Sequence, residues 1–465
     1  MRNPPASSRM MAGRTTTSTV QPSKDVLRPW KPERQNIYLL RKATIVDVLD
    51  GRLIYNQDVW LKNGLISSIS LSSATRSIEK EGVREIDLTG KYLCPGLIDA
   101  HVHLTAVPGE KDLGDLFTLD TQRGFMRQPY VCQQMLRRGF TSVRDCGGAS
   151  LALKQAIEEN IIQGPRLFIA GRALSQTGGH GDVRGPHNHH SSDCCGGTVI
   201  ALARVCDGVA DCLKAAREEL RTGADFIKIM AGGGVASPTD RLENVQFTAE
   251  EVRAISECAR NSNTYVTAHA YTSRSVRHAI DNGATGIEHG NLIDEATARY
   301  MAEKGVFLTP TLITYSAMAS PEYPGFLPDE SNAKNGEVLR AGLRALKIAS
   351  KAGVTLCFGT DLLGPLGVAQ SKEFGLRAQA LQGHEVLKSA TVNPARMFGQ
   401  AEFLGQIKEG FAADLIVLNQ DPLKNIEILD TPEKHVLAIF KEGRVFHSRW
   451  SKVVQDVLPR DENIE

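Results

Sequence analysis

The sequence lacks long apolar runs and any excess of charge of one sign. None of its apolar stretches reaches about 18 residues, so no transmembrane helix is expected. The 54 lysines and arginines balance 53 aspartates and glutamates, which leaves no electrostatic basis for binding nucleic acid or an anionic membrane. The 42 glycines and the 42% hydrophobic content instead suit a soluble α/β enzyme with many tight turns.

Paired-cysteine motifs and a secretory signal are also absent. The nine cysteines form no Cys-X-X-Cys pair, and their odd number indicates a reducing compartment, so we expect a cytoplasmic protein. Residues 1–36 contain no apolar segment of the kind that a signal peptide requires. Their Arg/Ser bias leaves a mitochondrial transit peptide open, although we interpret them as a disordered tail.

Short apolar strands alternate with amphipathic helical stretches across residues 97–400. Eight such units predict a (β/α)8 TIM barrel, because the rival doubly wound sheet seldom needs eight of them. The expected strands are Leu97–His103, Thr141–Asp145, Leu167–Leu174, Phe226–Met230, Tyr265–Ala270, Gly286–His289, Phe307–Thr311 and Thr355–Asp361.

Both ends of the chain are rich in short β segments. Residues 37–96 carry Asp50-Gly51 and Asn63-Gly64 at positions typical of hairpin turns, and β character returns at residues 401–450. We expect the two ends to pair into one small β-sandwich domain beside the barrel. Residues 451–465 are predicted to form a C-terminal tail.

Polar side chains stand where the predicted barrel strands end. His101 and His103 lie one residue apart, so strand alternation places both imidazoles on one face, as half of a metal site. Each position also has an ordinary structural explanation, such as a core histidine or a helix N-cap. Their joint occurrence favours metal binding, since catalytic groups of such barrels gather at the carboxyl ends of the strands. The other candidates are Lys228, His269, His289 and Asp361.

The order His-X-His, Lys, His, His, Asp on strands 1, 4, 5, 6 and 8 resembles the amidohydrolase superfamily in its binuclear-metal branch. Flanking segments agree with this resemblance, and they are Gly90–Gly96, Asn393–Arg396, Leu404–Gly410 and Ala412–Leu415. A narrower similarity to the Xaa-Pro dipeptidase and ochratoxinase-like group is carried by Ala173–Asp182 and Lys228–Pro238.

The resemblance implies a carboxylated Lys228 that bridges two divalent metal ions, for which Zn²⁺ suits the nitrogen-rich ligand set. It implies hydrolysis of an amide bond next to a free carboxylate by a metal-bridging hydroxide, in an N-acyl amino acid, a dipeptide or an ochratoxin-like amide. Asp361 would carry the proton as general base and then as acid. A small-molecule substrate and a homo-oligomer are implied as well. The remaining ligands would be His101, His103 and Asp361 for one ion, and His269 and His289 for the other.

Two further residues are candidates for contacts with the substrate. His180 lies in a glycine-rich loop and Tyr271 follows His269, and either could donate a hydrogen bond to an oxyanion or to a substrate carboxylate. For His180 the alternative is that Gly179-His180-Gly181 only shapes the loop. The cluster His187–His190 is interpreted as a solvated loop, and Arg144 and Asp145 as structural polar residues. The loops expected to set specificity, which carry no readable chemistry, are Leu104–Arg123, Gly178–Gly208, Thr314–Lys334 and Leu362–Glu373.

Other functions remain open on the same metal centre. A mononuclear deaminase of this superfamily would lack the lysine on strand 4, so Lys228 disfavours that alternative. A lactonase, a decarboxylase, a dehydratase and an inactive scaffold are the remaining hypotheses. Complete metal ligands argue against the scaffold, and none of the nine cysteines is assigned a catalytic role.

Overall fold

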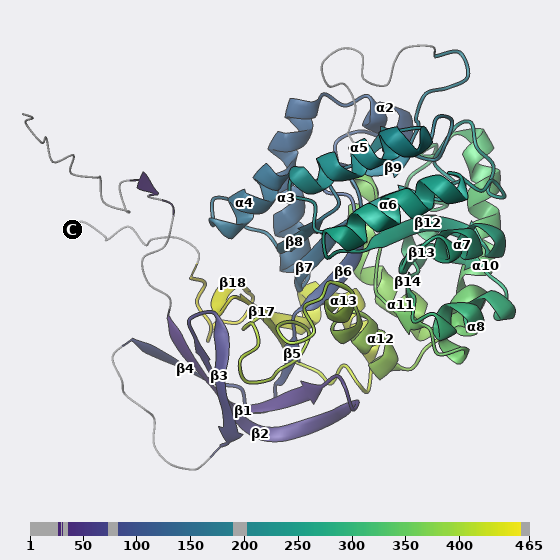
Figure 1. Cartoon of the computed structure of the whole chain (residues 1–465). Coiled ribbons are helices and arrows are strands. Elements are labelled where there is room, and N and C mark those ends of the chain that lie inside the picture. The colour runs from purple at the N-terminus through teal and green to yellow at the C-terminus, as the bar shows by residue number, and fades with distance from the viewer. Residues whose placement is uncertain (1–26, 29, 31–35, 73–81, 189–201, 457–465) are drawn as a thin grey trace, which may run out of the picture.

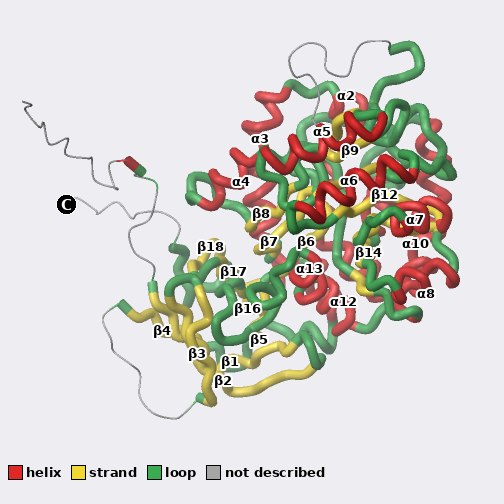
Figure 2. The backbone as a smooth tube through the Cα atoms, in the orientation of Figure 1, coloured by secondary structure: helices red, strands yellow, loops and turns green. Residues whose placement is uncertain are grey.

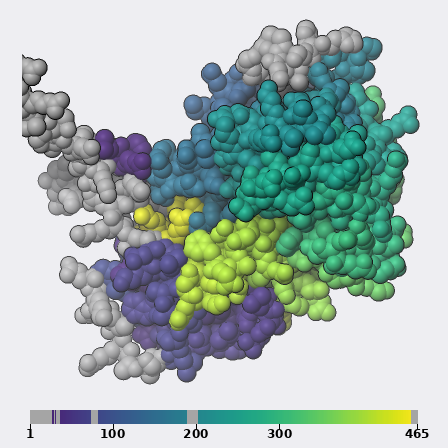
Figure 3. Space-filling view, viewed as in Figure 1, coloured from purple at the N-terminus to yellow at the C-terminus, as the bar shows by residue number. Residues whose placement is uncertain are grey.

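A small β unit and a larger α/β part make up the computed structural model, which describes residues 27–28, 30, 36–72, 82–188 and 202–456 (Figure 1). Most of the expected N-terminal tail, together with His189 and His190, lies outside the described residues. The first strands of the chain and its last ones lie on the same side of the molecule (Figure 3).

The β unit is one continuous mixed sheet in which both chain ends pair, and strands from its two halves share one apolar core. Its strand order is β18-β17-β16-β5-β1-β2-β3, and β4 pairs with β1. Asn63 and Gly64 connect β2 to β3 with φ angles of 54° and 81°, as a tight hairpin turn requires. The strands are β1 (Ile37–Asp47), β2 (Arg52–Lys62), β3 (Leu65–Leu71), β4 (Val83–Asp87), β5 (Tyr92–Pro95), β16 (Leu415–Leu418), β17 (Val436–Lys441) and β18 (Arg444–Ser448).

The start of the expected C-terminal tail is fastened to this sheet. Asp456 accepts hydrogen bonds from the Tyr38 hydroxyl at 2.6 Å and from the Val445 backbone N–H at 2.9 Å. Because these contacts join residues far apart in the sequence, the β unit extends to residue 456.

The α/β part contains two parallel sheets, one of three strands (β6-β7-β8) and one of seven (β10-β9-β11-β12-β13-β14-β15). The expectation of a parallel α/β fold is therefore confirmed. The strands are β6 (Leu97–Val102), β7 (Phe140–Asp145), β8 (Arg166–Ile169), β9 (Ala173–Ser175), β10 (Ala203–Val205), β11 (Ile227–Met230), β12 (Val266–Thr272), β13 (Gly286–Leu292), β14 (Phe307–Thr309) and β15 (Thr355–Leu356).

Two of the predicted strands are longer than the regular strands in the structure. The third is interrupted at Gly171, whose φ of 68° turns the chain, so its halves β8 and β9 lie in different sheets. The eighth is regular only over β15, and the chain then continues to Asp361 in irregular form. Backbone hydrogen bonds nevertheless link the two sheets on both sides: Ala100 N–H to Phe358 O at 2.8 Å, and Asp225 N–H to Ile169 O at 2.7 Å.

Helices lie around the strands of the α/β part (Figure 2). Helix α6 (Ala249–Asn261) begins with a capping box between Thr248 and Glu251, which satisfies backbone N–H groups at its N-terminus. Among the helices in the described ranges, none combines the length and the hydrophobicity that crossing a bilayer requires. The others are α2 (Leu113–Phe117), α3 (Thr121–Arg137), α4 (Leu151–Glu158), α5 (Gly208–Arg221), α7 (Ser273–Asp281), α8 (Glu295–Glu303), α9 (Leu312–Met318), α10 (Asp329–Lys351), η1 (Gly364–Lys372), α11 (Glu373–Ala378), α12 (Gly383–Ser389), α13 (Val392–Met397), η2 (Ile426–Asp430) and α14 (Pro432–His435).

Candidate metal centre

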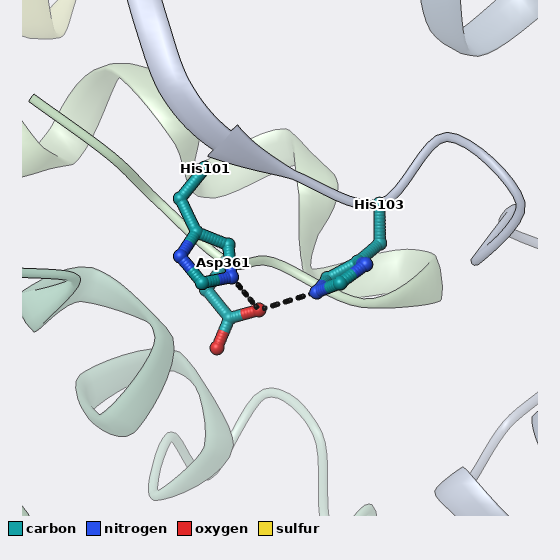
Figure 4. A group of neighbouring side chains, drawn as sticks. All are labelled: His101, His103 and Asp361. Atoms are coloured by element: carbon teal, nitrogen blue, oxygen red, sulfur yellow. Dashed lines mark ion pairs between the residues drawn. The ribbon is translucent and has the colours of Figure 1, made fainter. Parts of the chain in front are cut away.

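Three of the sequence-predicted ligands meet at the ends of β6 and of the segment after β15 (Figure 4). The Nε2 atoms of His101 and His103 lie 3.3 and 3.1 Å from the same carboxylate oxygen, Oδ1 of Asp361. One ligand atom from each of these residues falls within 4.8 Å of the others. Asp361 therefore joins two histidines that precede it by more than 250 positions in the sequence.

His269 on β12 and His289 on β13 complete a group of four neighbouring imidazoles. The ring centre of His289 lies 5.0 Å from that of His101 and 4.6 Å from that of His269. The register of the two strands, which pairs Ala270 with His289, brings these two rings together.

The backbone is left-handed at two of the clustered residues, since φ is 75° at His289 and 52° at Asp361. Such angles cost a non-glycine residue about 1–3 kcal/mol and persist only where the surroundings enforce them. Asp361 is held by its own backbone N–H, which donates to the carbonyl oxygen of His101 at 2.8 Å. Strain of this kind concentrates at functional sites, and here it occurs at two candidate ligands.

In His101 and His103, the ring nitrogen Nδ1 lies close to an oxygen atom. His103 Nδ1 lies 2.9 Å from the carbonyl oxygen of Gly147, which can only accept, so Nδ1 carries the proton. His101 Nδ1 lies 2.8 Å from Oε2 of Glu288 in the same manner. Both Nε2 atoms face the Asp361 carboxylate, so three sets of lone pairs converge once these nitrogens have lost their protons. This arrangement fits a cation bound between the two histidines and Asp361.

The rings of His269 and His289 are likewise oriented by contacts between one ring nitrogen and oxygen atoms. His269 Nε2 donates to the carbonyl oxygen of Gly233 at 3.2 Å. His289 Nδ1 lies 2.8 Å from the Thr311 hydroxyl and 3.0 Å from the Tyr315 hydroxyl. Within the described residues, the opposite ring nitrogens have no hydrogen-bond partner. Histidine ligands of metals characteristically use one nitrogen for the metal and the other for such an oxygen.

Glu288 is a site residue that the sequence reasoning missed. Its carboxylate accepts from His101, from the Thr267 hydroxyl and from the guanidinium of Arg144, whose Nη2 is 2.5 Å from Oε1. Burial opposes ionisation of Glu288, but the nearby charges of Arg144, Lys228 and His101 hold its pKa well below the usual range. Arg144, which we expected to make structural polar contacts, thus orients His101 through Glu288.

Lys228 lies on β11 with 1% of its surface exposed. The register pairs it with Thr267, whose hydroxyl contacts Glu288, and so places it beside the cluster. No carboxylate or hydrogen-bond acceptor pairs with its ammonium in the part of the chain that the structure describes. A buried and unpaired charge is unfavourable, so this position fits a lysine that is chemically modified or ion-bound.

The electrostatics hold His269 and Asp361 in protonation states that bind a metal. Burial, with the charges of His180 and His289, holds the pKa of His269 well below its usual value, so this imidazole is neutral. Burial acts against the charge of Asp361, but His101 and then His103 keep the pKa of this carboxyl well below its usual range. Neutral imidazoles and an ionised carboxylate are the forms that bind divalent metals.

His180 and Tyr271 both lie against His269. The His180 ring stacks on that of His269 at 4.1 Å, and its Nδ1 lies 2.8 Å from the Ser237 hydroxyl, which in turn contacts Asp240. The Tyr271 ring lies 4.9 Å from the His269 ring. Both residues thus border the metal cluster, where contact with a substrate is geometrically feasible.

The segment Thr314–Lys334, which was expected to be a loop, includes the end of α9 and the start of α10 and supplies two residues of this region. The Tyr315 hydroxyl donates to that of Tyr271 at 3.1 Å and also contacts His289. Lys334 Nζ donates to the carbonyl oxygens of Gly234 and Ser237, both at 2.9 Å, and so holds the segment that carries Ser237. The signal available in the sequence was a tyrosine four residues after the predicted strand Phe307–Thr311.

The chain was compared with known proteins. The Amidohydrolase family model matches residues 92–446. The ochratoxinase of Aspergillus niger is 32% identical over 426 residues, which cover 87% of each chain. Among solved structures, a prolidase complexed with N-methylphosphonate-L-proline is 41% identical, with a TM-score of 0.84, and covers 89% of this chain and 100% of its own. The crystal structure of the A. niger ochratoxinase is 28% identical, with a TM-score of 0.76, and covers 90% and 96%.

Proposed function

This chain belongs to the amidohydrolase family, in its ochratoxinase-like group, and we propose that it hydrolyses an amide bond next to a free carboxylate in a small substrate. The family and its relatives show that the protein is a hydrolase of carbon–nitrogen bonds. The main support for this proposal is the group of four imidazoles. In each ring, one nitrogen contacts an oxygen atom that fixes the orientation of the ring, and the other nitrogen is directed away from that oxygen.

Two divalent metal ions, for which Zn²⁺ suits the ligands, would be held by these residues. Such ions supply Lewis acidity and lower the pKa of bound water from about 15.7 towards 7. Lys228, once carboxylated by CO₂, would be the bridging ligand, in agreement with its burial without an acidic partner. The remaining ligands would be His101, His103 and Asp361 for one ion, and His269 and His289 for the other.

Proton transfer is assigned to Asp361, whose carboxylate is ionised and lies at the centre of the cluster. It would accept the proton of the attacking water and pass it to the leaving amine. His180 and Tyr271 would orient the substrate by hydrogen bonds to its carbonyl or carboxylate oxygens. We also infer that the two parallel sheets act as one (β/α)8 barrel, because backbone hydrogen bonds join them on both sides.

The preference for a carboxylate next to the scissile bond is supported by the relatives. A structural neighbour with 41% identity is a prolidase that binds N-methylphosphonate-L-proline, and another is a Xaa-Pro dipeptidase with methionine in its active site. One bound molecule is an amino-acid derivative and the other is an amino acid. We propose that dipeptides, N-acyl amino acids and ochratoxin-like amides form the substrate class of this chain.

Matched substrates test the proposal. Metal-reconstituted protein should hydrolyse dipeptides or N-acyl amino acids, and it should act at least about tenfold more slowly when the carboxylate is converted to an amide, because a charge-assisted contact is lost. Equal rates would contradict the preference for a carboxylate. Release of ammonia from aminated heterocycles, without amide hydrolysis, would favour a deaminase instead.

A variant pair tests the role of the buried lysine. Lys228→Ala should reduce kcat to background, whereas Lys214→Ala, which changes an exposed lysine on the preceding helix α5, should leave it unchanged. Full turnover in Lys228→Ala would remove the bridging ligand from the proposal.

A further inference from the structure

A mainly apolar pocket lies between helix α3 and the 3-10 helix η1, and it borders the metal cluster only at His103. It contains about 580 Å³ of empty space, a volume that includes its opening to solvent. Tyr130 and Val368, which are 56% and 65% exposed, line it and give it an opening to the surface. Its apolar lining includes Val102, Val131, Met135, Leu362, Pro365 and Val368.

One cationic side chain, Arg138, also lines this pocket, beside Gln134 and Gln370. Its Nη1 donates to Oε1 of Gln370 at 3.3 Å, and within the described residues no carboxylate pairs with it. Burial lowers the pKa of Arg138, because water is largely removed from the guanidinium without an anion to replace it. A guanidinium has five N–H donors, so most of its capacity for a planar anion is unused.

We propose that this pocket binds an aliphatic carboxylate, with the hydrocarbon chain against the apolar lining and the carboxylate on Arg138. The hydrocarbon would cover apolar surface that is now open to water. The carboxylate would supply the negative charge that Arg138 lacks, in the planar geometry that a guanidinium matches. This inference rests on different residues from the proposed hydrolysis, because the pocket touches the metal cluster only at His103 and the carboxylate is assigned to Arg138.

A chain of hydrogen bonds connects the pocket to the residues beside the metal ligands. Nε2 of Gln370 donates to Asp99 at 2.9 Å. Asp99 in turn accepts from the backbone N–H groups of His101 at 3.1 Å and Thr360 at 3.2 Å. A carboxylate on Arg138 would therefore lie at one end of a hydrogen-bond chain that extends to the backbone of His101 and Thr360.

The test uses the full chain with its metals removed by a chelator, so that binding is measured without turnover. Octanoate should bind in isothermal titration calorimetry. Octanamide, which has the same length without the charge, and acetate, which has the charge without the chain, should each bind at least about tenfold more weakly. The Arg138→Gln variant should lose about tenfold in octanoate affinity and keep its affinity for octanamide. Its control is Arg137→Gln, which removes the neighbouring exposed arginine and should bind octanoate like the wild type.

Several outcomes would overturn the proposal. Equal affinities for octanoate and octanamide, or equal losses in both arginine variants, would show that Arg138 does not recognise a carboxylate. Absence of octanoate binding, together with a change of oligomeric state in the variants, would assign the pocket to a second copy of the chain. If Arg138→Gln does not fold, Val368→Asp replaces it. Its negative charge at the opening should weaken the binding of octanoate, which is also negative, and leave the affinity for octanamide unchanged. An unchanged preference for octanoate would contradict the proposal.

Discussion

The contact between Glu288 and Arg144 allows a quantitative prediction for Glu288→Gln. Both side chains are 0% exposed, and their charged atoms lie 2.5 Å apart. The glutamate uses one oxygen for Arg144 and the other for His101. A glutamine has only one carbonyl oxygen, so its NH₂ group must face one of these two donors. Breaking a buried pair in this way costs about 3–5 kcal/mol, because the remaining charge has no partner.

Two measurements follow from this change. The free energy of unfolding of metal-free protein, determined in urea at neutral pH, should fall by about 3–5 kcal/mol. Metal affinity, determined by competition with a chelator, should fall by about 10–100-fold, because His101 loses the oxygen that orients it. Glu303→Gln, an exposed substitution at the end of helix α8, is the control and should change stability by less than about 0.5 kcal/mol. A loss below about 1 kcal/mol with unchanged metal affinity would refute the reasoning.

Three further predictions concern stability and assembly. Burial raises the pKa of Asp430 to about 6, although Gly375 N–H donates to it. The folded protein therefore binds this proton more tightly than the unfolded chain does, so stability should fall as the pH rises from about 4 to about 6. Asp430→Asn should lack that slope in urea titrations, and an unchanged slope would contradict the assignment. Gly96→Ala should cost about 1–3 kcal/mol in the same assay, because its Cβ would lie 2.1 Å from the Thr141 hydroxyl; a neutral effect would show that Thr141 moves freely. The expected homo-oligomer is checked by light scattering, in which a mass of 50.6 kDa, that of one chain, would contradict it.

The sequence was sufficient for the family and for the elements that carry the candidate ligands. Strand alternation alone explains why His101 and His103 share one face. His269 and His289 lie near the ends of recognisable apolar strands. Family membership, which the motifs indicated by resemblance, is confirmed by the comparisons. The ligand roles and the carboxylated Lys228 stay predictions.

The groups around the ligands could not be predicted, because their roles depend on sheet register. Glu288 accepts from His101 only because β13 lies in a register that brings it beneath that ring, and a single sequence does not specify this pairing. Tyr315 reaches His289 from a helix that follows β14, in a segment without a recognisable motif. The break at Gly171 was missed because a single glycine in an apolar run is compatible with a continuous strand.

Metal content tests the central claim most directly. After carbonate and Zn²⁺ are supplied to chelated protein and excess metal is removed, elemental analysis should find about two ions per wild-type chain. Lys228→Ala should retain about one or none, since the bridging ligand is lost, while Lys214→Ala should match the wild type. A wild-type chain that retains no metal, or a Lys228→Ala chain that retains both ions, would contradict the account.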